Sequence, residues 1–138
     1  MTKQFLEWTE ALAVDHGLID SDHRHLIMLI NRFHDSVESG ANGDLVCKTL
    51  CDLADYSCFH FIREETLMST IGYGARAAHI AEHNSFVNRL TEMTAAFEQG
   101  KLDSKVILDY LPVWIVNHVM KTDQNFGRYL ADYHQQGW

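Results

Sequence analysis

The fold of this chain is indicated most clearly by residues 53–67, which read LADYSCFHFIREETL. Leu53, His60, Glu64 and Leu67 follow one another in this stretch at intervals of seven, four and three residues. An α-helix turns once in about 3.6 residues, so these four side chains share one face. The face combines leucines with an imidazole and a carboxylate. We therefore predict an amphipathic helix whose inward face carries candidate metal ligands.

Similar spacing recurs along most of the chain, and Pro112 is its only proline. We predict four helices separated by glycine-containing turns, with Asp20 or Ser21 capping the first. Their expected ranges are about 20–39, 44–69, 75–99 and 104–120. Residues 1–19 would form an N-terminal arm, and the tail 122–138 would contain a short C-terminal helix. The expected fold is all-α, an antiparallel up-down-up-down four-helix bundle made of one domain, residues 1–138.

Charge and composition narrow the range of partners. The chain has 11 Lys and Arg against 19 Asp and Glu, a net charge of −8, which disfavours nucleic acid and anionic membrane surfaces. No secretion signal and no apolar run of about 20 residues is visible, so we expect a cytoplasmic protein without membrane insertion. Three cysteines are typical of a reducing compartment rather than of a disulfide framework.

Five histidines and two carboxylates form the candidate metal site. Neutral imidazoles bind transition metals, and carboxylates bridge pairs of them. A single buried histidine is more often a core residue with one hydrogen bond. Burying five together without a metal would leave many polar atoms unsatisfied, at about 1 to 3 kcal/mol each. We therefore predict a two-metal centre formed by His23, His60, Glu64, His79, His83, His118 and Asp123.

The remaining histidines and the cysteines are not expected to bind the metals. His34 lies about 16 Å along the helix axis from His23, so we assign it to core packing. His16, His25 and His134 are expected at the surface. The cysteines, which should project away from His60 on their helix, are Cys47, Cys51 and Cys58.

Four segments resemble the hemerythrin family, and specifically its bacterial members. They are IDSDH at 19–23, HFIREETLM at 60–68, HIAEH at 79–83, and WIVNH at 114–118 continuing to Asp123. The resemblance extends from Trp8 to about Tyr129. The chain departs from the family at Gly74, where proline is usual, and at Asp22, where glutamine or glutamate is usual.

The resemblance implies a non-haem centre of two iron ions. His79, His83 and His118 would bind one iron, and His23 and His60 the other. Glu64 and Asp123 would bridge them together with an oxo or hydroxo group, leaving one position open for dioxygen. The implied function is reversible dioxygen binding for storage, buffering or delivery, without enzymatic turnover. The residues expected to line the dioxygen pocket are Leu26, Ile27, Phe61, Trp114, Ile115 and Val119.

The sequence also fits other roles for Asp22 and for the metal centre. We expect Asp22 to accept a hydrogen bond from His60 and orient it, but a solvated acid at a helix start fits the sequence equally well. An open iron position would also serve a diiron enzyme that reduces peroxide or nitric oxide. A sensor of oxygen or redox state is a third possibility, and it would need a separate signalling partner.

Overall fold

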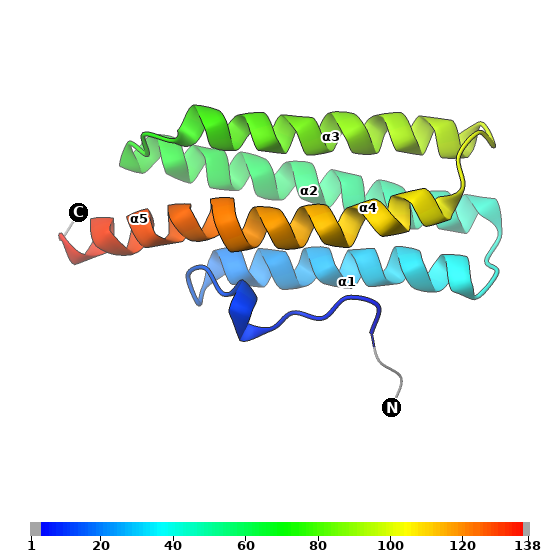
Figure 1. Cartoon of the computed structure of the whole chain (residues 1–138), viewed down its shortest axis with the longest axis horizontal. Helices are drawn as coiled ribbons and strands as arrows, with labels where there is room; N and C mark the ends of the chain where they lie inside the picture. The colour runs from blue at the N-terminus through cyan, green and yellow to red at the C-terminus, as the bar shows by residue number, and fades with distance from the viewer. Residues whose placement is uncertain (1–3, 137–138) are drawn as a thin grey trace.

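The computed structural model of the chain describes residues 4–136. Its five α-helices are α1 (Leu18–Glu38), α2 (Gly43–Ile71), α3 (Arg76–Glu98), α4 (Ser104–Asn117) and α5 (Gln124–Gln135). Helices α1 to α4 lie side by side and alternate in direction (Figure 1), which confirms the predicted all-α up-down-up-down bundle. Within the described part, no helix combines the length and apolar character needed to cross a bilayer.

Two apolar clusters enclose a polar layer inside the bundle. The larger cluster includes Leu26, Leu53 and Phe33, and the smaller one, at the α5 end, includes Ile19 and Met68. Along α1 and α2, the candidate ligands therefore lie between residues of the two clusters. Apolar side chains therefore cover the candidate site on both sides along the bundle axis.

The start of α1 differs from the prediction. Asp15, and not Asp20 or Ser21, accepts hydrogen bonds from the backbone N–H groups of Gly17, Ile19 and Asp20, at 2.9, 3.0 and 3.1 Å. Asp20 is buried and accepts from the N–H groups of Val14 and His16, at 2.7 and 2.9 Å. The expected cap was wrong because the Asp20 carboxylate binds the N-terminal arm.

The last two helices form one continuous rod. We expected a break near residue 121, but α4 passes into α5 through a π-helical segment, His118–Asp123. In an α-helix, residues five apart point about 140° away from each other. The wider π-helical turn brings His118 and Asp123 to the same side, with Nε2 and Oδ1 at 3.1 Å.

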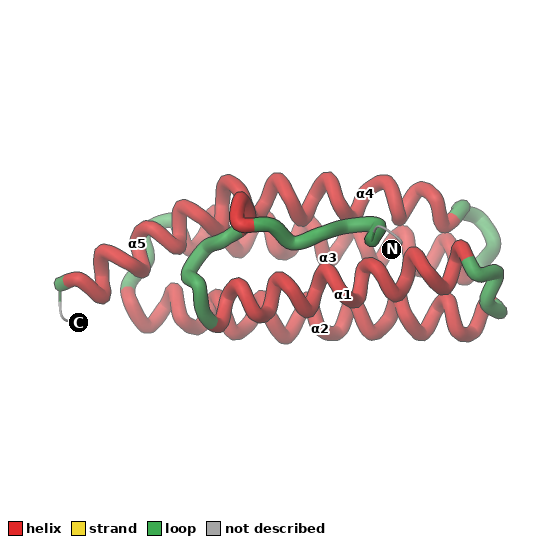
Figure 2. Tube along the Cα trace, turned by 90° about the horizontal axis from the view of Figure 1, so that it is seen from below, coloured by secondary structure: helices red, strands yellow, loops and turns green. Residues whose placement is uncertain are grey.

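The N-terminal arm crosses the bundle on the side formed by α1 and α4 (Figure 2). The Asn31 side chain exchanges two hydrogen bonds with the backbone of Leu6, each 2.9 Å long. Farther along, the arm packs against Gly127 of α5 so closely that a Cβ there would lie 2.7 Å from Val14 Cγ1. Residues 1–3 of the expected arm and 137–138 of the expected tail lie outside the described residues.

The first prediction concerns this close approach. Gly127→Ala should lower the free energy of unfolding by about 1 to 3 kcal/mol, because the new methyl group overlaps the side chain and the carbonyl of Val14. Gly43→Ala is the matched control, since nothing lies within 4 Å of its added Cβ. Urea unfolding of both metal-free variants provides the measurement. Equal stability of the two variants would show that the contact is not tight.

Candidate metal centre

All seven candidate ligands meet in the polar layer. His23 comes from α1, His60 and Glu64 from α2, and His79 and His83 from α3, while His118 and Asp123 come from the π-helical segment. Each is almost fully buried, with at most 4% of its surface exposed. Four elements of the bundle therefore contribute donors to one interior point, as the helical spacing of the sequence led us to expect.

The donor atoms form two overlapping groups, and within each group the atoms lie no more than 4.8 Å from one another. The first consists of Glu64, His79, His83, His118 and Asp123, and the second of His23, His60, Glu64 and Asp123. Both carboxylates belong to both groups. The site is thus asymmetric, with three imidazoles on one side, two on the other, and a pair of shared carboxylates.

The contacts inside the layer fit metal coordination better than hydrogen bonding. His79 Nε2 lies 2.7 Å from Glu64 Oε1 and 2.9 Å from Asp123 Oδ1. Nevertheless, none of the carboxylate oxygens of Glu64 and Asp123 makes a contact with hydrogen-bond geometry within the described residues. His83 and His118 bring their Nε2 atoms to 3.2 Å. Cations between these atoms would satisfy the inward-facing lone pairs together.

The ionisable groups of the layer shift one another's pKa values. Burial, and then the Asp123 charge, would raise the pKa of Glu64, but contacts with His60, His79 and His83 lower it to about 2. Burial would lower the pKa of His60, yet its hydrogen bond to Asp22 and its contact with Glu64 raise it to about 9. The pKa of His79 is likewise raised to about 9, against the effect of burial, by Asp123 and Glu64. Without a metal, protons take the place of the cations, so metal binding would release them.

Three imidazoles are held from outside by carboxylates. His60 Nδ1 lies 2.8 Å from Asp22, His83 Nδ1 2.7 Å from Glu65, and His118 Nδ1 2.9 Å from Glu82. An N–H donated outward fixes the ring and leaves Nε2 free to face the centre. Sequence reasoning missed Glu65 and Glu82. The available signal was that each directly adjoins a candidate ligand.

Asp22 is the most strongly engaged of these carboxylates. In addition to His60, it accepts from the Tyr56 hydroxyl at 2.9 Å and from Arg63 Nη2 at 2.6 Å. Burial would raise the pKa of Asp22, but hydrogen bonds from His60, Tyr56 and Arg63 lower it to about 2. Asp22 is therefore a buried anion at neutral pH and not a solvated acid at the start of a helix.

A small cavity of about 10 Å³ lies against His23. Ile27, Ile115 and Val119 line it, as do two residues that the sequence analysis missed, Leu12 of the arm and Val116. This is about the smallest space that can hold one water molecule. An apolar space of molecular size therefore adjoins the side of the centre that has two imidazoles.

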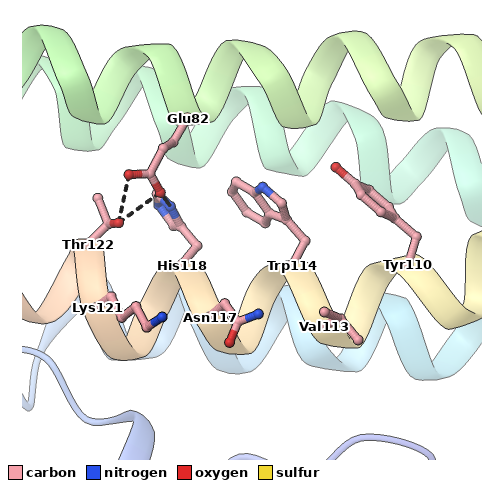
Figure 3. A pocket seen from close by; sticks show the side chains of 8 residues that line it. All are labelled: Glu82, Tyr110, Val113, Trp114, Asn117, His118, Lys121 and Thr122. Atoms are coloured by element: carbon pink, nitrogen blue, oxygen red, sulfur yellow. Dashed lines mark hydrogen bonds and ion pairs between the residues drawn. The ribbon is translucent and has the colours of Figure 1, made fainter.

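Leu26, Phe61 and Trp114, also predicted for the pocket, do not line this cavity. Leu26 belongs to the larger apolar cluster. Phe61 stacks on His83 with ring centroids 3.9 Å apart, and Trp114 stacks on His118 at 4.5 Å. Trp114 and His118 instead form the wall of an outer pocket, where Glu82 also binds Thr122 (Figure 3). The aromatic rings take these positions because they cover the faces of imidazoles.

The residues left out of the site lie elsewhere. His34 is half-buried and stacks on Phe5 with ring centroids 4.2 Å apart, while His16, His25 and His134 are exposed. Neither donor group contains a cysteine among the described residues. All three cysteines are free thiols.

The raised histidine pKa values generate a second prediction. A histidine with a raised pKa stabilises the fold below its ordinary value of 6.5, and this stabilisation is lost as the pH rises through about 9. The free energy of unfolding of the metal-free protein should therefore fall between pH 6.5 and 9.5, as measured by urea unfolding. His60→Gln should make the decline shallower, whereas His134→Gln, at an exposed position, should not. A flat profile in the unmodified protein would contradict the account.

Comparison with known proteins agrees with this geometry. The family described as hemerythrin HHE cation binding domain matches residues 15–130. The bacteriohemerythrin of Methylococcus capsulatus is 32% identical, over 91% of this chain and 97% of that protein. Myohemerythrin-1 of Phascolopsis gouldii is 27% identical, over 84% of this chain and 87% of that protein. A crystal structure of wild-type hemerythrin superposes with a TM-score of 0.82 at 32% identity, covering 89% of this chain and 95% of that one. The chain therefore belongs to the hemerythrin family.

Proposed function

We propose that this protein binds dioxygen reversibly at a centre of two iron ions, and so stores, buffers or delivers the gas. The observation that carries the proposal is the pair of donor groups that share Glu64 and Asp123. His79, His83 and His118 would hold one iron, His23 and His60 the other, and the two carboxylates would bridge them. Membership of the hemerythrin family supports the choice of iron.

A pair of ferrous ions supplies the electrons that reversible dioxygen binding requires. The side chains provide the remaining conditions. One metal position would be surrounded by three imidazoles and two carboxylates. The other would be surrounded less completely, by two imidazoles and the same two carboxylates. The second position therefore has more room for a small ligand, and the apolar cavity at His23 adjoins it. Ile27, Ile115 and Val119 give dioxygen a site that disfavours water.

The size of the cavity favours a carrier over an oxygenase. A volume of about 10 Å³ leaves no space for an organic substrate beside the gas. The imidazole-rich donor set also differs from the carboxylate-rich sites of many di-iron bundles. Peroxide and nitric oxide are about as small as dioxygen, so the turnover assay separates them from the carrier: the carrier predicts negligible turnover of either.

We infer a reducing compartment, such as the cytoplasm, from the cysteines. Cys47, Cys51 and Cys58 are all free thiols, and two of them are exposed. Exposed thiols persist where disulfides do not form readily. The net charge of −8 argues against a nucleic acid partner.

A third prediction tests the proposed centre. Protein loaded anaerobically with ferrous iron should contain about two irons per chain, as expected for two joined donor groups. Under air it should develop a visible charge-transfer band that fades under argon. His23→Ala should reduce the iron content and abolish the reversible band, because it removes one of the two imidazoles on its side. His25→Ala, an exposed residue on the same helix, is the matched control.

Two outcomes would overturn the proposal. Retention of zinc alone, or of no metal, would refute the di-iron centre. Multiple turnovers with hydrogen peroxide or nitric oxide and a reductant, without reversible oxygenation, would establish the enzyme in place of the carrier.

A fourth prediction concerns Asp22. Its buried negative charge makes His60 a stronger donor, which stabilises ferric iron. Asp22→Asn should therefore raise the reduction potential, slow oxidation in air and lower iron affinity by about 10- to 100-fold. Spectroelectrochemistry and the rate of autoxidation measure these effects. Asp35→Asn, at an exposed site on the same helix, is the control. An unchanged potential and oxidation rate in Asp22→Asn would remove Asp22 from the proposed centre.

A further inference from the structure

The wall of the His23 cavity has one residue that does not come from the bundle. Ile27 comes from α1, Ile115 and Val116 from α4, and Val119 from the π-helical segment, but Leu12 comes from the N-terminal arm. Leu12 ends a single short turn, Glu10–Leu12, and its side chain is buried. Its position depends on how the arm is attached to the bundle.

Gln124 makes that attachment on both sides of Leu12. Its side-chain amide donates to the carbonyl oxygen of Ala11 at 2.8 Å and to that of Ala13 at 3.2 Å. An amide nitrogen has two hydrogens, so one side chain can make both bonds. The turn's own bonds, from Leu12 N to Thr9 O and from Ala13 N to Glu10 O, are local to the arm. Gln124 therefore fixes the turn against the bundle.

Gln124 also follows the candidate ligand Asp123 directly, as the first residue of α5. The two side chains leave adjacent positions in the backbone in different directions. Asp123 contacts His23 and His79 in the centre, whereas Gln124 reaches the arm. A single peptide unit thus links the residue that contacts the arm, Gln124, to the candidate ligand Asp123.

We propose that Leu12 is the gate of the cavity at His23 and that Gln124 is the positioning residue that holds this gate closed. The proposal deepens the proposed function and rests on it, because it names the route by which dioxygen reaches the centre. The cavity holds only about 10 Å³, and every residue of its wall except the half-buried Val116 is buried, so gas can pass only if the wall moves. The other four wall residues lie on long helical elements, whose hydrogen-bond ladders resist local opening. A three-residue turn opens at lower cost.

The outer pocket at Trp114 provides the competing route. It approaches the centre from the opposite donor group, where His118 is one of three imidazoles. The His118 ring lies in the wall of this outer pocket. It is held there by stacking on the Trp114 ring and by its hydrogen bond to Glu82 (Figure 3). Opening this route would require displacing a candidate ligand, so we assign gas entry to Leu12.

The test compares Gln124→Ala with Asn125→Ala, its exposed neighbour on the same helix. In iron-loaded protein, stopped-flow measurement should show dioxygen association and dissociation at least about fivefold faster in Gln124→Ala, because two hydrogen bonds on the turn are lost. Asn125→Ala should match the unmodified protein. Leu12→Phe should slow both rates by filling the entrance, which keeps the test valid if Gln124→Ala folds poorly.

Xenon provides a readout that does not depend on iron. In zinc-loaded protein, ¹²⁹Xe NMR should show tighter xenon binding in Leu12→Ala, because apolar cavities of adequate size bind xenon. Xenon exchange should be faster in Gln124→Ala than in Asn125→Ala. If xenon exchange is faster in Gln124→Ala but the iron-loaded protein does not bind dioxygen, the carrier function is refuted and the role of Leu12 as a gate is supported. Unchanged dioxygen rates and xenon exchange in folded Gln124→Ala and Leu12→Phe would overturn the gate and favour entry at Trp114.

Discussion

The structure depends on two buried carboxylates that five imidazoles share. Contacts with histidines lower the pKa values of Glu64 and Asp123 and keep both ionised. The same contacts raise the pKa of His79, and the contact with Glu64 adds to the effect of Asp22 on the pKa of His60. Two anions this deep inside a bundle are costly unless cations or protons accompany them. The apolar clusters on either side stabilise the fold, while the polar layer destabilises it unless its charge is balanced. The binding of cations in this layer would therefore be coupled to folding.

The asymmetry of the centre extends to the residues around it. On the side with two imidazoles, Asp22 is buried and its charge is balanced by Arg63. On the side with three, Glu82 is 46% exposed, so water screens its charge. The side with fewer protein ligands thus has the most buried outer carboxylate, since Glu65 on the other side is 20% exposed, and it also adjoins the apolar cavity. Both features fit a position that would receive a small ligand.

The features that could be predicted from the sequence are those set by short, regular spacing: the helices and the ligand pairs that lie on one helix. His60 with Glu64 and His79 with His83 are one helical turn apart, and the four-helix bundle follows from the same periodicity. The contact between His118 and Asp123 could not be derived from α-helical geometry, because it needs a π-helical turn. The attachment of Leu12 could not be predicted either, since it depends on a side chain more than a hundred residues away. Long-range contacts of irregular segments carry no periodic signal.

The central claim is that one pair of carboxylates serves two metal positions with unequal numbers of imidazoles. Diffraction from crystals of the iron-loaded protein, recorded on both sides of the iron absorption edge, tests it most directly. The account predicts two anomalous peaks, one beside His79, His83 and His118 and the other beside His23 and His60, with Glu64 and Asp123 reaching both. A single peak, or two peaks that share neither carboxylate, would contradict it.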